Sequence, residues 1–448
     1  MDLIEKYNVA GPRYTSYPPV PHWQSTPPTA TEWLQSVQQA GVDNQGLSLY
    51  VHLPYCEHLC HYCGCNKQIT RRHELEEPYI NAVLAEWALY RTWLPFSVRI
   101  REIHLGGGTP TFFSPLMLAK LIEGLMVGGT LAEDTQFSLE GHPGNTTYAH
   151  LLVLRELGFE RLSLGVQDFD PVVQQAINRQ QSTEEVRRVT RWARDLSYTS
   201  INYDLIYGLP KQTLASVQST MEQVRALRPD RIAFYSYAHV PWKSRSQRCF
   251  ADDDLPSGTY KRQLYEQGRQ LLNQAGYEEV GMDHFALRGD ELLRASQAGR
   301  LHRNFMGYTT SQTPLLIGLG ASAISDSGVA FIQNEKNVEA YKKTVLEGRL
   351  ALSKGHLLNA EDQIIRRHIL NLMCRYETRF EGTIQERLAL CGLGDRLSPL
   401  VEDGLVIWHA KGLKLTEQGR PFVRNVAMAL DRRLAATRKS EEVFSKVV

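Results

Sequence analysis

Short apolar segments alternate with amphipathic segments between residues 47 and 236, and this alternation restricts the fold more than any other feature. The apolar segments have the length and composition of strands, and they are Leu47–Leu53, Ile100–Leu105, Gln136–Glu140, Arg161–Gly165, Thr199–Asp204 and Arg231–Ser236. Helical periodicity marks most intervening segments, such as Pro78–Leu94, Leu116–Leu125, Tyr148–Leu157 and Leu214–Leu227. Strands that alternate with helices predict a parallel sheet. Six units are fewer than the eight of a closed barrel, so we expect an α/β fold with an open, incomplete (βα)6 barrel.

The sequence around this alternation predicts three further regions. Residues 1–45 are rich in proline and polar residues and predict an irregular N-terminal arm, whereas residues 46–240 form the barrel. Over residues 241–358 the alternation weakens, and we expect an extension of the barrel on its substrate side. Residues 359–448 contain a helix (Ala360–Leu372), a short hairpin and a last helix, which is typical of a winged-helix-like α/β domain. We expect a lid or packing domain there, because no dense basic stripe indicates DNA binding.

Charge and hydropathy exclude several classes of function. The chain has 50 Lys and Arg against 49 Asp and Glu, so no general positive charge predicts nucleic acid or an anionic membrane as a partner. No apolar run reaches the roughly 18–20 residues of a membrane-spanning helix. The start, Met1–Tyr7, lacks the basic and apolar regions of a secretory signal. We therefore expect a cytoplasmic protein without nucleic-acid or membrane partners.

Four of the seven cysteines lie close together after the first predicted strand, namely Cys56, Cys60, Cys63 and Cys65. A disulfide framework is not expected in a cytosolic chain of this length. The spacing Cys-x3-Cys-x2-Cys gives one short loop three thiolates, which can bind three irons of a [4Fe–4S] cluster. A zinc site would prefer two Cys-x2-Cys pairs or additional histidines. Nearby histidines are His52, His58 and His61. The spacing and the aromatic residue before the third cysteine favour the cluster.

A cluster held by three cysteines leaves its fourth iron without a protein ligand. That iron can chelate the amino and carboxylate groups of S-adenosylmethionine, and electron transfer into the sulfonium then releases a 5′-deoxyadenosyl radical. We expect Cys56, Cys60 and Cys63 to be the metal ligands. Cys65 would block the open iron if it bound there, so we expect a free thiol or a packing residue.

Short motifs lie along nearly the whole chain. They are Gly11-Pro12-Arg13-Tyr14-Thr15-Ser16-Tyr17-Pro18, Cys63–Lys67, Gly106–Thr111, Leu164–Phe169, Asn178-Arg179, Asp204–Pro210, Gly281–Ala286 and His302–Phe305. Together with the cysteine loop, they resemble the radical S-adenosylmethionine superfamily and, within it, the oxygen-independent coproporphyrinogen III dehydrogenases. The cysteines and the glycine motif are typical of the superfamily, whereas the arm and the segment from His302 to Thr310 indicate this family.

The resemblance implies a cofactor site at the C-terminal ends of the strands, where ligands of such folds bind. Its glycine-rich turn would let the backbone approach the methionyl amino group, through Gly107, Gly108 and Thr109. Glu140 and Arg179 suit the ammonium and the carboxylate of the cofactor, and Asp204 suits its ribose hydroxyls. Further cofactor contacts are implied for Tyr50, Tyr62, Gln167, Ala238 and Ile324. Catalytic roles are implied for Tyr50, Glu140, Phe305 and Ile324.

Two positions depart from the pattern of the family. His142 stands in Glu140-Gly141-His142-Pro143, where many members have Glu-x-Asp-Pro. Met306 stands where many members have Gln, in a segment tied to a second S-adenosylmethionine. The thioether of Met306 cannot form the hydrogen bonds of a Gln amide, although it can pack on an adenine or a tetrapyrrole. The resemblance thus implies the [4Fe–4S] cluster and one S-adenosylmethionine, and Met306 leaves a second one open.

The resemblance also implies a reaction in haem biosynthesis. The radical removes a hydrogen from the β-carbon of a propionate of coproporphyrinogen III, and loss of CO2 and one electron gives a vinyl group; a second propionate follows, which gives protoporphyrinogen IX. An electron donor such as flavodoxin or ferredoxin and a monomeric enzyme are implied. Because the tetrapyrrole substrate carries several carboxylates, the mouth of the site should present cations and aromatic side chains. The candidates are Arg13, Tyr14, Tyr17, His302 and Arg303.

Three alternatives stay open at this point. An enzyme of the same branch could transfer a methyl group, which would give S-adenosylhomocysteine and no CO2, or could cleave haem. A haem-binding or trafficking protein could use the fold without decarboxylation, although such relatives generally lack the Gly-Pro-Arg-Tyr arm and Cys63-Gly64-Cys65. A winged-helix regulator with a sensing cluster would need a basic recognition surface.

Overall fold

The computed structural model describes residues 2–24, 26–40, 45–94, 98–436 and 444–447, and its centre is a sheet of 12 strands. The six predicted strands all form, lie parallel and follow one another in chain order across the sheet. They are β1 (Leu47–Leu53), β4 (Val98–Gly107), β5 (Gly129–Gly141), β6 (Phe159–Gln167), β7 (Ser200–Tyr207) and β8 (Arg231–Ser236). The prediction of a parallel α/β sheet is therefore confirmed.

Both edges of the sheet come from the region after residue 240, so the sheet runs across the predicted boundary there. Beside β1 lies parallel β13, followed by antiparallel strands, and antiparallel strands also follow β8. These strands are β13 (Leu316–Leu319), β14 (Ile324–Asp326), β15 (Ala330–Asn334), β16 (Leu352–Leu357), β10 (His284–Leu287) and β9 (Tyr277–Val280). The sheet order begins at β16 and ends at β9, so the barrel stays open.

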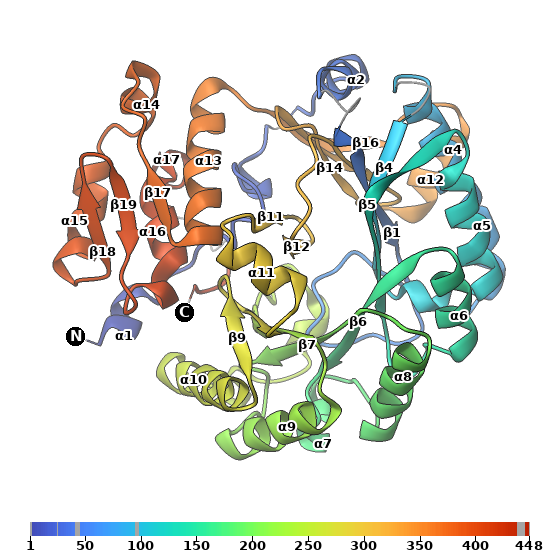
Figure 1. Cartoon of the computed structure of the whole chain (residues 1–448), viewed down its shortest axis with the longest axis horizontal. Coiled ribbons are helices and arrows are strands. Elements are labelled where there is room, and N and C mark those ends of the chain that lie inside the picture. The colour runs from blue at the N-terminus through green and yellow to red at the C-terminus, as the bar shows by residue number, and fades with distance from the viewer. Residues whose placement is uncertain (1, 25, 41–44, 95–97, 437–443, 448) are drawn as a thin grey trace.

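Helices cover the outside of the sheet, on the right and at the bottom of Figure 1. They are α4 (Glu76–Arg91), α5 (Pro115–Met126), α6 (Tyr148–Glu156), α7 (Pro171–Ala176), α8 (Thr183–Asp195), α9 (Leu214–Leu227), α10 (Gly258–Gln274) and α12 (Val338–Leu346). Strand side chains such as Leu49, Val51, Ile103 and Leu105 are buried among these helices. Because side chains alternate along a strand, the residues between them point into the barrel.

The prediction of an irregular N-terminal arm is wrong for two segments, α1 (Leu3–Tyr7) and α2 (Ala30–Gln39). A capping box starts α2: Thr29 Oγ1 accepts a hydrogen bond from Glu32 N, and Glu32 Oε2 accepts one from Thr29 N. Trp33, Leu34 and Val37 are buried on one face of this helix. The prolines before Thr29 therefore precede a helix and do not extend an irregular segment.

The last part of the chain forms a separate layer at the left of Figure 1. A small antiparallel sheet with the order β17-β19-β18 packs with helices, as the winged-helix-like prediction requires. These elements are α13 (Ala360–Arg375), β17 (Glu377–Arg379), α14 (Ile384–Ala389), α15 (Leu393–Glu402), β18 (Val406–His409), β19 (Gly412–Leu415), α16 (Val423–Leu430) and α17 (Arg432–Ala436). We call them the C-terminal unit.

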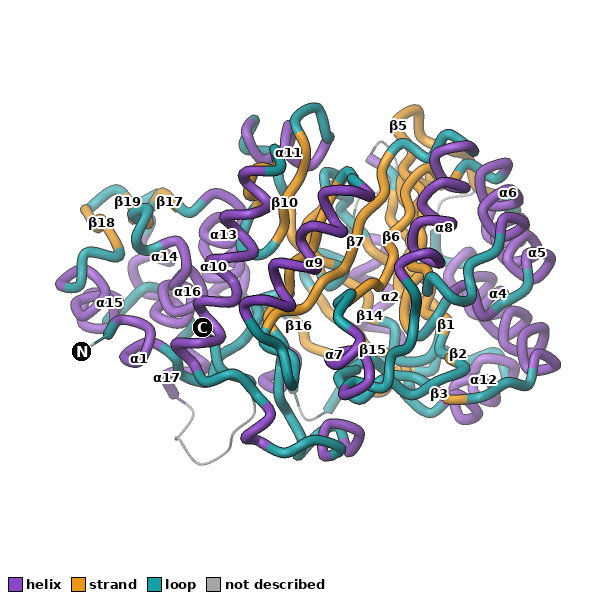
Figure 2. The backbone as a smooth tube through the Cα atoms, turned by 90° about the horizontal axis from the view of Figure 1, so that it is seen from below, coloured by secondary structure: helices purple, strands orange, loops and turns teal. Residues whose placement is uncertain are grey.

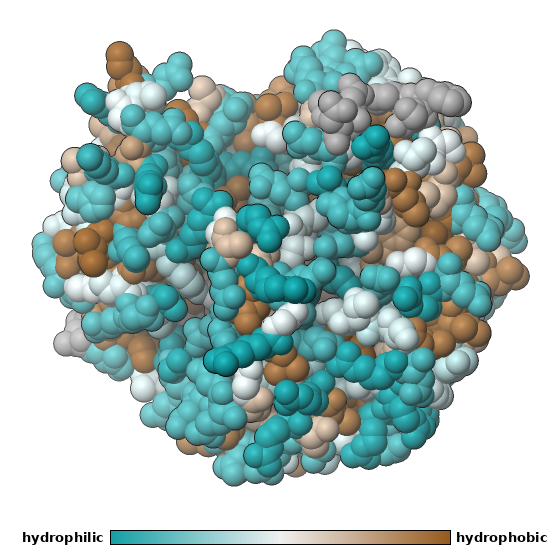
Figure 3. Space-filling view, viewed as in Figure 1, coloured by the Kyte–Doolittle hydropathy of each residue, from teal (hydrophilic) through white to brown (hydrophobic). Residues whose placement is uncertain are grey.

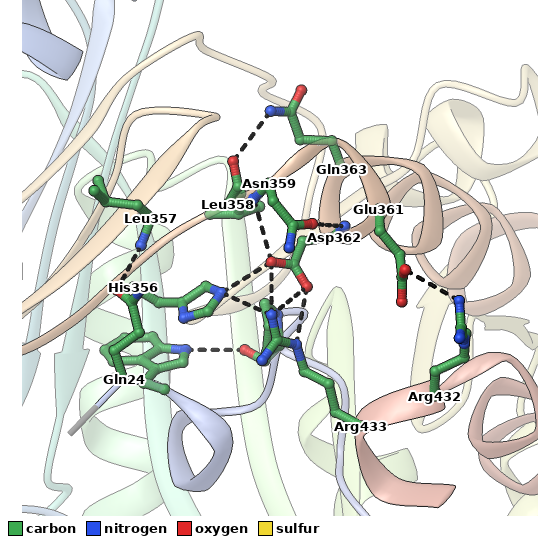
Figure 4. Close-up of polar contacts among 12 residues, drawn as sticks. Gln24, His356, Leu357, Leu358, Asn359, Glu361, Asp362, Gln363, Arg432 and Arg433 are labelled. Carbon is green, nitrogen blue, oxygen red and sulfur yellow. Dashed lines mark hydrogen bonds and ion pairs between the residues drawn. The ribbon is translucent and has the colours of Figure 1, made fainter. Parts of the chain in front are cut away.

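A buried carboxylate joins the C-terminal unit to the edge of the large sheet (Figure 4). Asp362 of α13 lies 3.0 Å from His356 Nε2 of β16 and accepts two hydrogen bonds of 2.9 Å from Arg433 of α17. Burial alone would raise the pKa of Asp362, but the contacts with His356 and Arg433 outweigh it and lower that pKa. The arm joins the same region, because Gln24 accepts a hydrogen bond from Leu357 N.

Among the described residues, no helix is long and apolar enough to cross a membrane. Figure 3 shows hydrophilic side chains over most of one face of the molecule, with hydrophobic residues scattered between them.

Glu86 of α4 is a fully buried carboxyl group behind the barrel. Its Oε2 accepts hydrogen bonds from Gly320 N (2.8 Å) and Tyr341 OH (2.6 Å), and its Oε1 accepts one from Asn334 Nδ2 (2.6 Å). Burial raises the pKa of Glu86 to about 7, although these hydrogen bonds lower it in part.

We expect Glu86→Gln to reduce the pH dependence of stability. A carboxyl whose folded pKa lies near 7 stabilises the protein fully at low pH and loses that contribution as the pH rises through 7. Between pH 6 and pH 8, the free energy of unfolding of the wild type should fall by about 1.4 kcal/mol relative to the variant. Thermal unfolding of both proteins at the two pH values measures this difference. Equal pH dependence would show that Glu86 does not titrate there.

Candidate functional site

The cysteine loop follows β1 directly and is held on two sides. The two-residue strands β2 (Tyr55–Cys56) and β3 (Gln68–Ile69) pair and close the loop. On one side, His61 N donates a 2.9 Å hydrogen bond to Ile177 O, just after α7. On the other side, Gln247 Nε2 donates to Tyr62 O (3.0 Å) and Ser244 Oγ donates to Cys63 O (3.3 Å).

The loop borders a cavity of about 650 Å³ at the C-terminal ends of the parallel strands. This cavity brings together most of the residues that the sequence predicted from five separate segments. Its lining includes Cys56, Cys60, Tyr62, Cys63, Gly107, Gly108, Thr109, Glu140, Gln167, Arg179 and Asp204.

Hydrogen-bond donors face two of the three thiols. Thr109 Oγ1 donates to Cys56 Sγ (3.3 Å), and Arg179 Nη1 donates to Cys60 Sγ (3.5 Å). A hydrogen bond from Cys65 and the positive charge of the nearby Lys67 lower the pKa of Cys63, despite its burial. The described residues include no group of three His, Cys, Asp or Glu placed to hold one metal ion. Protein thiolates bind the irons of a [4Fe–4S] cluster, and three thiols around one cavity with donors beside them fit a cluster that takes three of its ligands from the protein.

Strand β4 runs two residues further than predicted, so that Gly106 and Gly107 of the glycine-rich motif are the last residues of the strand. A Cβ on Gly106 would lie 3.0 Å from Glu140 Oε1, and one on Gly107, at φ +115°, would lie 2.7 Å from His52 Nδ1. A Cβ on Gly108 would lie 2.7 Å from the carbonyl oxygen of Pro54. Only glycine lets the backbone run this close to its neighbours while it faces the cavity.

Glu140 lies near the end of β5 and is held from two sides. His104 Nε2 lies 3.2 Å from Oε1, and Gly107 N donates to Oε2 (3.3 Å). Burial would raise the pKa of Glu140, but His104 outweighs it and lowers the pKa, so the carboxylate is ionised at neutral pH. Ser138 Oγ lies 2.7 Å from the other nitrogen of His104. Sequence reasoning missed His104, although its alternation with Glu102 and Gly106 along one strand could have indicated an inward-facing position.

Asp204 lies within β7, which continues to Tyr207, so the prediction that it ends the strand is wrong. Its carboxylate accepts hydrogen bonds from Ser163 Oγ (3.1 Å) and Asn202 Nδ2 (2.8 Å). Burial raises the pKa of Asp204 to about 6, with a contribution from the negative charge of Glu140. The carboxylate therefore carries its charge at pH 7 and can accept further hydrogen bonds from a ligand.

Four predicted site residues do not line the cavity. Tyr50 lies beside it, with its hydroxyl 3.0 Å from His52 Nδ1 and its ring stacked on His104. Ala238 stands behind the loop, where its carbonyl accepts a hydrogen bond from Gln247. Phe305 and Ile324 pack in an apolar cluster around Trp23 and Phe331. The roles of all four stay predictions.

The five residues that the sequence proposed as substrate contacts lie in different parts of the structure. Tyr14 and Tyr17 are each only 2% exposed in the core of the C-terminal unit, so they do not face a cavity mouth. Arg13 donates to Ser236 O (2.6 Å), and His302 lines a different cavity of about 430 Å³. Arg303 is 4% exposed, and its Nε and Nη1 have no hydrogen-bond partner.

The two departures from the family pattern both face cavities. His142 lines the large cavity, and burial lowers its pKa to about 2, so this imidazole is neutral where a carboxylate would be charged. Met306 lies between β11 (His302–Asn304) and β12 (Gly307–Thr309). It lines an interior cavity of about 120 Å³ together with Glu140 and Asp204.

Comparisons with known proteins agree with this site. The family model described as the radical SAM superfamily matches residues 50–224. Oxygen-independent coproporphyrinogen III oxidases from Pseudomonas aeruginosa and Escherichia coli are 41% and 39% identical, and each alignment covers 100% of this chain and 98% of the relative. The solved structure of the coproporphyrinogen III oxidase of Escherichia coli, described as a radical SAM enzyme, matches with a TM-score of 0.86 and 37% identity. That match covers 94% of this chain and 97% of the other.

We expect Arg179→Gln to make the reduction potential of a bound cluster more negative. The guanidinium beside Cys60 stabilises the negative charge that a cluster gains on reduction. The expected shift is on the order of 50 mV, which for one electron corresponds to about 1 kcal/mol. A redox titration followed by electron paramagnetic resonance, without added ligands, measures it. Arg187→Gln, which changes an exposed arginine on α8, is the control; an equal shift in both variants would contradict this role of Arg179.

Proposed function

This chain belongs to the oxygen-independent coproporphyrinogen III oxidases of the radical SAM superfamily, and we propose that it converts coproporphyrinogen III into protoporphyrinogen IX. The observation that carries the proposal is the single cavity that joins three cysteine thiols to a glycine-rich turn, two carboxylates and a guanidinium. The full-length similarity to relatives of that name supports the same reaction, and it favours decarboxylation over methyl transfer, haem cleavage or haem trafficking.

In the proposed enzyme, Cys56, Cys60 and Cys63 would hold the [4Fe–4S] cluster. When bound, the cluster and S-adenosylmethionine would supply the radical chemistry that converts a propionate into a vinyl group with loss of CO2. Thr109 and Arg179 donate hydrogen bonds to two of the ligand sulfurs and so stabilise their negative charge.

The other polar residues of the cavity would bind and orient the cofactor. We infer that the ionised Glu140 receives the ammonium group, and that the backbone of Gly107 and Gly108 passes close to it. His104 is a positioning residue, since it keeps Glu140 ionised and in place. Asp204 would accept hydrogen bonds from ribose hydroxyls, while Ser163 and Asn202 fix its orientation.

For the substrate carboxylates, we favour Arg303 among the candidates. It is buried, two of its nitrogen atoms have no hydrogen-bond partner, and a buried donor without a partner costs free energy that an anionic ligand would recover. For the cofactor, we propose one S-adenosylmethionine. The space beside Met306 is about 120 Å³, whereas ligand sites usually measure roughly 300–1,000 Å³, so a second molecule would require movement of the β11–β12 hairpin.

Three further properties are proposals that rest on the sequence and on the family. They are a location in the cytoplasm, a monomeric state, and a reductant of the flavodoxin or ferredoxin type.

Activity with the proposed substrate is the direct test. Protein reconstituted and reduced without oxygen should convert coproporphyrinogen III and S-adenosylmethionine into protoporphyrinogen IX, 5′-deoxyadenosine and two CO2 for each tetrapyrrole. Replacement of Cys56, Cys60 or Cys63 by alanine should abolish iron binding, because each removes one ligand, whereas Cys65→Ala should retain it. Formation of 5′-deoxyadenosine with an unchanged tetrapyrrole would contradict the substrate, and S-adenosylhomocysteine without CO2 would indicate methyl transfer.

We expect Glu140→Gln to weaken binding of S-adenosylmethionine roughly 10- to 100-fold, since a hydrogen bond to a charged group is worth about 1.5–3 kcal/mol. Equilibrium dialysis with cluster-loaded protein measures the affinity, and iron content shows whether the cluster site is intact. Glu160→Gln, an exposed change outside the cavity at the start of β6, is the matched control. Unchanged affinity in Glu140→Gln would remove this carboxylate from the cofactor site.

A further inference from the structure

The surface around the cysteine loop is basic, although the whole chain carries 50 positive and 49 negative side chains. Residues 57–72, 241–249, 335–336 and 354 hold eight Lys or Arg and only two Glu. The basic residues are Lys67, Arg71, Arg72, Lys243, Arg245, Arg248, Lys336 and Lys354. This local excess of positive charge contrasts with the nearly balanced charge of the whole chain and indicates a function for this surface.

Direct hydrogen bonds tie these segments to the cysteine loop. Lys67 Nζ donates to Cys63 O (3.1 Å), and Ser244, next to Lys243, donates to the same carbonyl (3.3 Å). Asn66 Nδ2 donates to Lys336 O (3.0 Å). Figure 2 shows β3, which ends the loop, beside α12, which begins just after Lys336. These hydrogen bonds place Lys67 and the segments of Lys243 and Lys336 against the loop that presents the three thiols.

Three lysines from three segments gather on this surface. Burial and, after it, the positive charges of Lys336 and Lys354 lower the pKa of Lys243. All three residues are exposed. In the segment beside Lys336, Glu335 accepts hydrogen bonds from the backbone N–H of Lys336 and Asn337, and Glu339 pairs with Lys342. An acidic partner surface would complement the positive charge of the three lysines.

Two large apolar side chains lie among the cations. Trp242 precedes Lys243, and Ile69 pairs with the ligand residue Cys56 between β3 and β2; each is 43% exposed. Exposed aromatic and aliphatic residues within a ring of charges are typical of protein–protein interfaces. A small anion would need the cations but not these two side chains, so the combination favours a protein partner.

We propose that this loop surface, defined by Lys67, Lys243, Lys336, Lys354, Trp242 and Ile69, is the docking site of a small acidic electron-donor protein. The inference rests on the proposed function, in which a cluster at Cys56, Cys60 and Cys63 must be reduced. One electron leaves the flavin or iron–sulfur centre of the partner, which is oxidised, and enters the cluster, which is reduced. No bond forms or breaks. Because electron transfer weakens steeply with distance, the partner must dock over the loop that presents the cluster.

The test compares two reductants on one variant. Lys243→Glu, Lys336→Glu and Lys354→Glu together reverse the charge of the surface without touching the cavity. With reduced flavodoxin at low salt, the rate of cluster reduction should fall roughly tenfold or more, the usual scale of electrostatic steering, and the salt dependence of the wild type should flatten. With dithionite, which needs no docking, cluster reduction and tetrapyrrole conversion should equal those of the wild type.

The matched control replaces three exposed cations by glutamate in the small sheet of the C-terminal unit and its turn. They are Arg379, Lys411 and Lys414. The cluster of this control should be reduced at the wild-type rate by both flavodoxin and dithionite.

Three outcomes would overturn the proposal or its premise. An equal loss of rate with dithionite and flavodoxin in the lysine variant, or a raised KM for the tetrapyrrole with dithionite, would assign the three lysines to the fold or to substrate binding. Unchanged reduction by flavodoxin would also overturn the proposal. If the triple Glu variant binds no iron, the Gln variant at the same three positions replaces it. No activity of the wild type with dithionite would instead contradict the proposed function.

Discussion

The register of the parallel strands is the constraint on which the site depends. Parallel pairing places Tyr50 beside His104, His104 beside Ser138, and Glu140 beside Ser163. Because every second side chain points to the same face, these residues all enter the barrel, while Leu49, Ile103 and Leu139 are buried outside it. A shift of one residue in any strand would exchange the two faces, so burial of the apolar face fixes the chemistry of the polar one.

The polar interior is stable only because its members satisfy one another. His104 contacts both Glu140 and Ser138, and Asp204 accepts hydrogen bonds from two neighbouring residues. A buried carboxylate without such partners would be neutralised by a raised pKa, and Asp204 shows part of that effect with a pKa of about 6. Asp362 uses the same principle at the edge of the sheet, where His356 and Arg433 keep it charged.

Sequence reasoning identified the elements whose signals are local and strong. The six parallel strands and α13 follow from apolar periodicity, the cysteine spacing led to the superfamily, and the arm with the segment from His302 to Thr310 led to the family. It missed α2, because prolines before Thr29 masked a capping box. It also gave no individual strands between residues 241 and 358, where β11 to β14 have only three or four residues each. It proposed Tyr14 and Tyr17 as substrate contacts, since nothing local indicated that the C-terminal unit buries them.

The sequence by itself determined the cysteine loop, the glycine turn and the alternation of strands and helices, because each depends on residues that are close together in the chain. Only the tertiary structure decided that His104 holds Glu140, that Arg179 reaches the sulfur of Cys60, and that Lys336 and Lys354 lie beside Lys243. Such contacts join residues from 36 to 119 positions apart. They arise from strand register and helix packing, which no single stretch of sequence specifies.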